Sequence, residues 1–348
     1  MANLSSPSVR TMATDVHRTN LDRFVTSEPS LQPKSNSLLA YAVAQALKNL
    51  IPARLEDDYK IDTRSAPLGE GRFGTIRACT HLISGMQAAV KTQYKLHCKR
   101  NPVTGKFFEV EAMKALSPPA FQFFNSYETP LKLHIVTERL WGPSVFKYLD
   151  EKGWEKPRND REERECAKLV ARLLRGISLA HRAGYAHLDV KFENFMYRTS
   201  NDVHTGADPV LIDYGGARPL AGPRTLNDVV GSPSYAAPEV VLKGRFSDKS
   251  DSWSLGVMAF TILQGFFPLE CVDGRINDYN VYFCPLEWRR ISAEAQDFVR
   301  RLLKTDPRER MSINQALEHP WIVRAEEKFS SNNNSAAPNS PPQATAVL

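Results

Sequence analysis

The residues best suited to chemistry lie in one short stretch, HLDVKFEN, at His187–Asn194. Asp189 can accept a proton from a hydroxyl group, and Lys191 can stabilise negative charge that develops beside it. Asn194, together with Asp213 further along the chain, offers oxygen ligands of the kind that magnesium prefers. Transfer of a phosphoryl group needs positioning, charge neutralisation and a metal, so these residue types at these offsets indicate that chemistry.

A glycine-rich stretch upstream, LGEGRFGTI, could hold the phosphates. Gly69, Gly71 and Gly74 let the backbone approach phosphate oxygens closely and point N–H groups at them. The same spacing occurs in dinucleotide-binding folds, where it follows a strand and opens a helix. Here the residues that follow, Thr75–Cys79, continue as a strand, so the sequence favours a phosphate-binding hairpin.

Two charged residues downstream complete the candidate site. Lys91 ends the apolar strand AAVK; a lysine there would usually reach solvent, but beside a glycine-rich hairpin it can reach phosphates. Glu109 lies on a helix expected near Phe108–Leu116 and is the candidate partner of Lys91. Glu111 is the rival, but it falls on a different face of that helix.

Seven segments, in order along the chain, resemble the eukaryotic protein kinase domain over roughly Tyr59–Val323. They are LGEGRFGTI, AAVK, HLDVKFEN, DYG, GSPSYAAPE, DSWSLGV and LLKTDPRERMS. The stretches CTHLISG, EVEAM and EHPWI are similar to those of the calcium/calmodulin-dependent group. The resemblance implies a bilobal α+β fold, with a small β-rich N-lobe that holds one helix and a larger, mainly helical C-lobe.

The resemblance also implies a serine/threonine protein kinase that uses ATP and Mg²⁺ and acts on protein hydroxyls. The catalytic residues would be Asp189, Lys191, Lys91 and Glu109, and the metal ligands Asn194 and Asp213. The ATP-binding residues would be Leu68, Gly69, Glu70, Gly71, Arg72, Phe73, Gly74, Thr75, Ile76, Ala89, Lys91, Thr137, Glu138 and Leu140. The activation segment and substrate platform would include Thr225, Ser232 and Glu239.

Further roles are implied for residues around the catalytic loop. Ser232 would bridge Asp189 and Lys191, and the presence of Ser232 with Lys191 favours serine or threonine over tyrosine as the acceptor. Glu239 would form an ion pair with Arg310. Asp251 would accept hydrogen bonds from the backbone of the catalytic loop. Thr137 would precede the linker Glu138–Leu140 and leave room behind the adenine.

The catalytic loop departs from the family at two positions. Phe192 replaces a proline that shapes the loop, and Leu188 replaces an arginine that would pair with a phosphate on the activation segment. We therefore expect activity not to depend strongly on phosphorylation of Thr225, near which Arg218 and Arg224 are the closest basic residues left.

The substrate positions also depart from one branch of the family. Ser144 and Thr261 stand where kinases that prefer basic substrates often carry carboxylates, which argues against such a preference here.

The remaining sequence sets the organisation of the chain of 348 residues. We expect disorder over residues 1–36, a helix and linker over 37–58, the kinase domain over 59–323 and a disordered tail over 324–348. The helix, expected at Ser37–Leu50, would either pack on the domain or bind a regulatory partner. An extra loop, Arg198–Pro209, is expected to be an exposed hairpin tip.

Composition bounds the compartment and the partners. The net charge of +6 is spread along the chain, which argues against nucleic-acid binding, and no apolar stretch is long enough to insert into a membrane. The five cysteines are scattered, as is typical of reduced thiols. We expect a cytoplasmic monomer with access to the nucleus.

Three functions are compatible with the loop pattern. An active kinase is favoured because the six expected residues are all present, whereas a pseudokinase scaffold would be expected to have lost at least one; they are Lys91, Glu109, Asp189, Lys191, Asn194 and Asp213. A small-molecule phosphotransferase could share the loop pattern, but GSPSYAAPE builds a platform for a peptide.

Overall fold

The computed structural model describes residues 54–327, apart from 72–73, 154, 227–229, 272–274 and 277. These residues form two compact units, the first made of residues 54–94 and 125–135 and the second of residues 95–124 and 136–327. The segment 1–36 and the helix expected at Ser37–Leu50 lie outside the described residues. Within the described part, no helix is long and apolar enough to cross a membrane.

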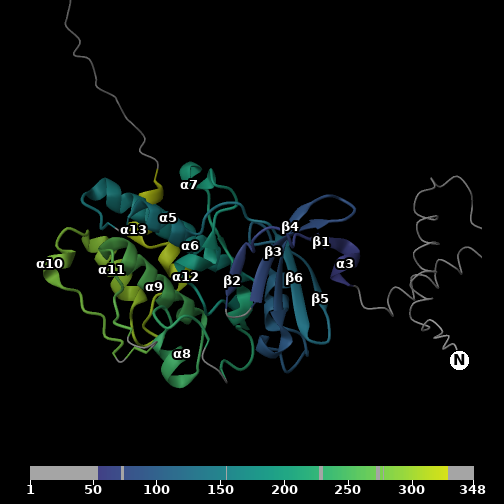
Figure 1. Ribbon diagram of the computed structural model, residues 1–348. Helices are drawn as coiled ribbons and strands as arrows, with labels where there is room; N and C mark the ends of the chain where they lie inside the picture. The colour runs from purple at the N-terminus through teal and green to yellow at the C-terminus, as the bar shows by residue number, and fades with distance from the viewer. Residues whose placement is uncertain are drawn as a thin grey trace, which may run out of the picture. The chain divides into compact units, whose positions relative to one another are not determined.

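The first unit is built on a curled sheet (Figure 1), whose strand order is β1-β3-β4-β6-β5, with β2 also paired to β3. Its elements are α3 (Leu55–Asp58), β1 (Tyr59–Ile61), β2 (Gly69–Gly71), β3 (Gly74–His81), β4 (Gln87–Tyr94), β5 (Phe123–Glu128) and β6 (Lys132–Glu138), the last two continuing into the second unit. Cys79, Ala88, Val90, Leu133 and Ile135 are buried and form its core. The hydroxyl of Tyr127 donates to Asp58 at 2.6 Å and so fixes α3 to the sheet.

The second unit is mainly helical. Its helices are α4 (Phe108–Ala115), α5 (Val145–Lys152), α6 (Asp160–Arg182), α7 (Asp202–Thr205), α8 (Pro238–Lys243), α9 (Asp248–Gln264), α10 (Pro285–Trp288), α11 (Ala293–Leu302), α12 (Ile313–Leu317) and α13 (Pro320–Glu326). Shorter pieces are η1 (Lys95–His97), β7 (Tyr185–Ala186), η2 (Phe192–Asn194), β8 (Phe195–Met196), β9 (Val210–Leu211), η3 (Tyr214–Gly216) and β10 (Arg218–Pro219). The expected α+β fold, β-rich and then helical, is confirmed.

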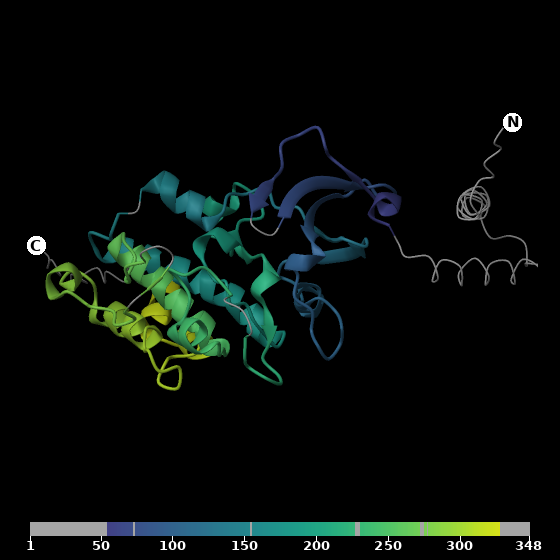
Figure 2. The same cartoon turned by 60° about the horizontal axis from the view of Figure 1, so that its bottom comes forward.

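Helix α9 is the centre of this unit, because it is buried along nearly its whole length and contacts α6, α11 and α12 (Figure 2). It begins at Asp248, where Ser247 and Ser250 form a reciprocal capping box. Helix α4 belongs to this unit too, where it contacts η3 and β10, although the sequence placed it with the sheet. One reason is that the ring of Phe108 lies 4.6 Å from the guanidinium of Arg218.

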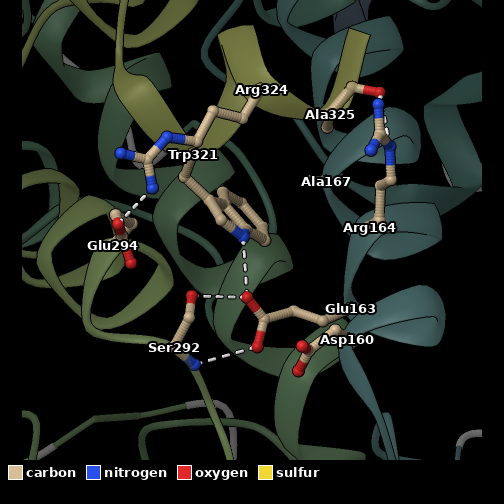
Figure 3. A pocket seen from close by; sticks show the side chains of 9 residues that line it. All are labelled: Asp160, Glu163, Arg164, Ala167, Ser292, Glu294, Trp321, Arg324 and Ala325. Atoms are coloured by element: carbon tan, nitrogen blue, oxygen red, sulfur yellow. Dashed lines mark hydrogen bonds and ion pairs between the residues drawn. The ribbon is translucent and has the colours of Figure 1, made fainter. Parts of the chain in front are cut away.

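A buried carboxylate ties three helices together at the edge of a hollow of about 330 Å³ (Figure 3). Glu163 of α6 accepts hydrogen bonds from the backbone and the hydroxyl of Ser292, which caps α11, and from the indole N–H of Trp321 in α13. With three donors the carboxylate is well satisfied, which is what allows a charge to be buried here.

Two segments of this unit extend what the sequence predicts. The segment Arg198–Pro209 joins the antiparallel strands β8 and β9, as expected of a hairpin tip, and it contains the short helix α7, which is capped by Gly206 at a φ of +78°. Helix α13 continues past Val323 to Glu326, where Ala325 is buried and its carbonyl accepts a hydrogen bond from Arg164. The domain bounds of 59–323 stay a prediction. Residues 328–348 lie outside the described part of the chain.

Candidate active site

The backbone of the catalytic loop is bound by Asp251, a fully buried carboxylate of α9. It accepts the backbone N–H groups of His187 and Leu188, both at 2.8 Å, and a hydrogen bond from His181 at 2.7 Å. Burial alone raises the pKa of Asp251, but the hydrogen bonds and charges of His181 and His187 outweigh it and hold that pKa below its usual value. The expected contact between Asp251 and the loop backbone is therefore present.

Leu188 adopts an unusual backbone conformation. Its φ is +63°, in the left-handed region, which costs roughly 1–2 kcal/mol for a residue with a Cβ. The hydrogen bond from its N–H to Asp251 and the burial of its side chain offset this strain. Leucine at this position therefore anchors the loop in the core.

His187 links the catalytic loop to the segment that carries Asp213. Its Nδ1 accepts from the backbone N–H of Asp189, so its Nε2 carries the proton and donates to the carbonyl of Ile212 at 2.9 Å. The same ring lies edge-on to Tyr214, with the centroids 4.8 Å apart. The backbone N–H of Ile212 in turn donates to the carbonyl of Asn194 at 2.8 Å.

Three side chains form a closed triangle at the mouth of the loop. Lys191 donates to Asp189 at 2.9 Å and to the hydroxyl of Ser232 at 2.8 Å. The hydroxyl of Ser232 donates to the other oxygen of Asp189 at 2.9 Å. These are the contacts expected of Ser232. The side chains of Lys191 and Asp189 remain 20% and 15% exposed, so the triangle can still be reached by a substrate.

The proposed metal ligands can be tested against their surroundings. The amide nitrogen of Asn194 donates to the carbonyl of Asp189 at 2.8 Å and to its carboxylate at 3.1 Å. Because the nitrogen is engaged in this way, the amide oxygen is the atom that Asn194 can present to a cation. Asp213 adds a carboxylate held at a φ of +60°. One carboxylate and one amide oxygen suit Mg²⁺, which keeps few protein ligands.

Phe192, the second departure in the loop, is fully buried in η2. Its ring lies edge-on to Tyr235, with the centroids 6.2 Å apart, and the N–H of Phe195 closes the turn on the carbonyl of Phe192. The loop thus keeps a tight turn without a proline, because an aromatic contact replaces the restriction that proline would impose.

The substrate platform is fixed by the expected ion pair. Arg310 donates to the two carboxylate oxygens of Glu239 at 2.7 and 2.9 Å, and Ser250 adds a third donor at 2.9 Å. The side chains of Arg310 and Glu239 are 0% and 9% exposed. This bidentate geometry satisfies both charges inside the core.

The activation segment is joined by its backbone to the loop after α8. Thr225 forms an antiparallel bridge with Arg245, the N–H of Leu226 donates to Gly244, and the N–H of Phe246 donates to Arg224. Thr225 itself is exposed.

The expectation that Arg218 remains near Thr225 as a phosphate partner is wrong. The guanidinium of Arg218 is buried against Phe108 and donates to the carbonyls of Gly216 and Ala217.

In the first unit, β2 and β3 form the glycine-rich hairpin, with Gly71 opposite Gly74. Gly74 has a φ of +149°, and a Cβ there would lie 2.1 Å from the carbonyl oxygen of Thr92, so only glycine fits. Arg72 and Phe73 lie outside the described residues. Lys91 lies on β4 opposite Ile76, the last residue of the glycine-rich stretch.

Glu109 and its rival are distinguished within α4. Glu109 is buried, whereas Glu111 accepts hydrogen bonds from Asn101 and Thr104. These hydrogen bonds hold Glu111 on the segment that precedes α4, so Glu109 remains the candidate for the site. The pairing of Glu109 with Lys91 of the other unit stays a prediction.

Sequence reasoning missed Arg198, which lies just after the catalytic loop and binds Glu138, the first residue of the linker. Its Nε and Nη2 donate to the two carboxylate oxygens at 3.0 and 3.1 Å. Nothing in the local pattern links two residues so far apart, so only the folded backbone shows the contact.

Comparison with known proteins agrees with the geometry. The family model described as "Protein kinase domain" matches residues 63–322. Calcium-dependent protein kinase 4 of Arabidopsis thaliana is 33% identical over 305 residues, which cover 85% of this chain and 56% of that protein. A calcium/calmodulin-dependent protein kinase of Emericella nidulans is 31% identical over 273 residues, 73% of this chain and 63% of its own length. The chain spans about half the length of the curated relatives it matches.

Proposed function

Since this chain belongs to the protein kinase family, we propose that it transfers the γ-phosphoryl group of Mg·ATP to serine and threonine hydroxyls of proteins. The observation that carries the proposal is the triangle of Asp189, Lys191 and Ser232, in which base, cation and platform are already in hydrogen-bond contact. A loop that had lost its function would have no need to keep these three groups aligned.

Each group has a role that follows from its surroundings. Asp189 orients the acceptor hydroxyl and takes its proton, because its carboxylate is held by three donors, from Lys191, Ser232 and Asn194, and is still partly exposed. Lys191 stabilises charge on the transferred group, and Ser232 fixes both side chains. Positioning and charge neutralisation are most of what phosphoryl transfer asks of a protein.

The cofactor proposal rests on the donor atoms and the hairpin. Asn194 and Asp213 would hold Mg²⁺, which would neutralise phosphate charge when bound. The glycine-rich hairpin from Leu68 to Ile76 and Lys91 would hold the phosphates, and Thr137 with the linker Glu138–Leu140 would hold the adenine. We further propose a cytoplasmic monomer, a state that light scattering and cell fractionation can test.

Regulation is also part of the proposal. We propose that phosphorylation of Thr225 is not needed for activity, because Leu188 is apolar and Arg218 is buried against Phe108. The backbone bridge between Thr225 and Arg245 supports an alternative way to order the segment.

The test is a transfer assay with labelled ATP, magnesium and a peptide library that contains serine, threonine or tyrosine acceptors. We expect label on serine and threonine peptides and a loss of at least about a thousandfold in Asp189→Asn. Asp150→Asn, an exposed aspartate of α5, is the matched control and should transfer at the native rate. ATP binding without transfer by the native chain would instead favour a scaffold.

A further inference from the structure

Arg198 joins three separate segments of the second unit. Its guanidinium grips the carboxylate of Glu138 with two donors and also donates to the carbonyls of Pro119 and Ala120, at 2.9 and 3.1 Å. The latter two carbonyls belong to the loop between α4 and β5. Only the planar, multiply donating guanidinium of arginine can satisfy all of these acceptors at once.

Glu138 is fully engaged on its side of the contact. One carboxylate oxygen also accepts the backbone N–H of Gln122 at 2.9 Å, and the backbone N–H of Glu138 donates to the carbonyl of Gln122 at 3.0 Å. The Glu138 side chain is 14% exposed and that of Arg198 is 33% exposed. An ion pair this sheltered from water is far more than a surface contact, because removing one partner leaves a largely buried charge.

The backbone beside Arg198 continues the attachment along the linker. The N–H of Trp141 donates to the carbonyl of Arg198 at 2.8 Å, and the N–H of Gly142 donates to that of Tyr197 at 3.2 Å. A Cβ on Gly142 would lie 2.6 Å from the carbonyl oxygens of Tyr197 and Thr199, so the backbone at Gly142 is in close contact with the segment that contains Arg198. The linker is thus fixed at its first residue by the Arg198 side chain, and the residue that follows the linker is fixed by the Arg198 backbone.

We propose that Arg198 is a positioning residue for the nucleotide: by fixing the linker Glu138–Leu140, it holds the backbone groups that bind the adenine. This inference rests on the proposed kinase function, since it assigns the linker to adenine. It acts through binding alone. Asp189, Lys191 and Asn194, which would carry out the transfer, make no described contact with Arg198.

The experiment measures the dissociation constant for ADP by calorimetry, together with KM for ATP, KM for a peptide and kcat, in Arg198→Met. We expect ADP to bind about tenfold more weakly and KM for ATP to rise by about as much, with kcat and the peptide KM within about twofold of native. Arg198→Lys keeps the positive charge but not the planar set of N–H donors, so it should recover only part of the affinity for ADP.

Arg175→Met is the matched control. Arg175 is 36% exposed, binds Asp208 through two donors and also pairs with Glu326, yet these partners are remote from the linker in sequence. It should bind ADP as the native chain does. Inorganic tripolyphosphate, which lacks adenine, should bind Arg198→Met and native chain equally, because the inference concerns the adenine contact alone.

Each other outcome is decisive. ADP affinity within about twofold of native in Arg198→Met would overturn the inference, as would an equal loss for tripolyphosphate. If Arg198→Met does not fold, Arg198→Lys and Glu138→Gln decide by the same criteria. If the native chain neither binds ADP nor transfers phosphate, the proposed function fails and this inference with it. Native transfer with no effect of Arg198 would overturn this inference alone.

Discussion

Replacing Arg310 with methionine tests whether the ion pair with Glu239 stabilises the fold of the second unit. The substitution keeps an apolar stem of similar length but removes two of the three hydrogen bonds described for the Glu239 carboxylate, leaving only that from Ser250. It also removes the donors that Arg310 provides to the carbonyls of Lys249, Lys304 and Thr305. A buried carboxylate and three carbonyl groups are therefore left with fewer partners than in the native fold.

The magnitude follows from burial. The two side chains are 0% and 9% exposed, and removing one partner of such a buried pair destabilises a protein by about 3–5 kcal/mol. Domains are stable by only about 5–15 kcal/mol, so Arg310→Met should lose a large share of its stability. We expect a value near the upper end of the range, because the backbone carbonyls lose donors as well.

Urea unfolding followed by tryptophan fluorescence is a suitable assay, because all five tryptophans of the chain fall within the residues of the second unit. Arg308→Met is the matched control: Arg308 lies two residues away and pairs with Asp306, but its side chain is 88% exposed. It should change the free energy of unfolding by less than about 1 kcal/mol. A loss below about 1 kcal/mol in Arg310→Met would refute the reasoning from burial.

Three other perturbations probe the loop, the hairpin and the activation segment. Burial opposes ionisation of Asp251, but hydrogen bonding and charge from His181 hold its pKa below the usual value. Ionised Asp251 should therefore stabilise the fold above about pH 4, and this stabilisation should be lost as the pH falls further. The free energy of unfolding, measured by urea titration at a series of pH values, should fall less steeply in acid for Asp251→Asn than for the native chain. An identical fall in both would contradict this. Gly74→Ala places a Cβ against the carbonyl of Thr92 and should weaken ATP binding by more than about tenfold while the fluorescence unfolding curve stays unchanged. Thr225→Ala should reduce turnover by less than about tenfold, or ~1.4 kcal/mol in barrier height, and a larger loss would show that phosphorylation matters.

The contacts of the site that could be predicted from the sequence are those between residues of recognisable motifs. The hydrogen bonds of Ser232 and the ion pair of Glu239 with Arg310 follow from seven segments in sequence, because each segment identifies one side of a contact. The helix expected near Phe108–Leu116 is α4, which ends one residue earlier. The start of α9 is set by the polar residue Ser247, which an apolar pattern does not record.

The unpredictable part depends on side chains that meet only after folding. The sequence places Arg218 near Thr225, but the folded chain buries its guanidinium against Phe108, so proximity in sequence gave the wrong partner. Arg198 carries no motif, and its contact with Glu138 spans sixty residues. The long, flexible side chains of arginine and lysine can contact residues that are distant in sequence, and local sequence patterns do not record such contacts.

The two departures in HLDVKFEN act on the fold of the loop and leave the chemical groups in place. Leu188 puts an apolar side chain into the core at a left-handed φ. Phe192 replaces a ring that restricts the backbone with one that packs on Tyr235 of the platform. In both cases the residue expected from the family resemblance is replaced by a buried apolar side chain. The backbone contacts of the activation segment with Gly244 and Arg245 support the proposal that no phosphate is needed to hold it, so the absence of a phosphate-binding arginine is consistent with an active loop.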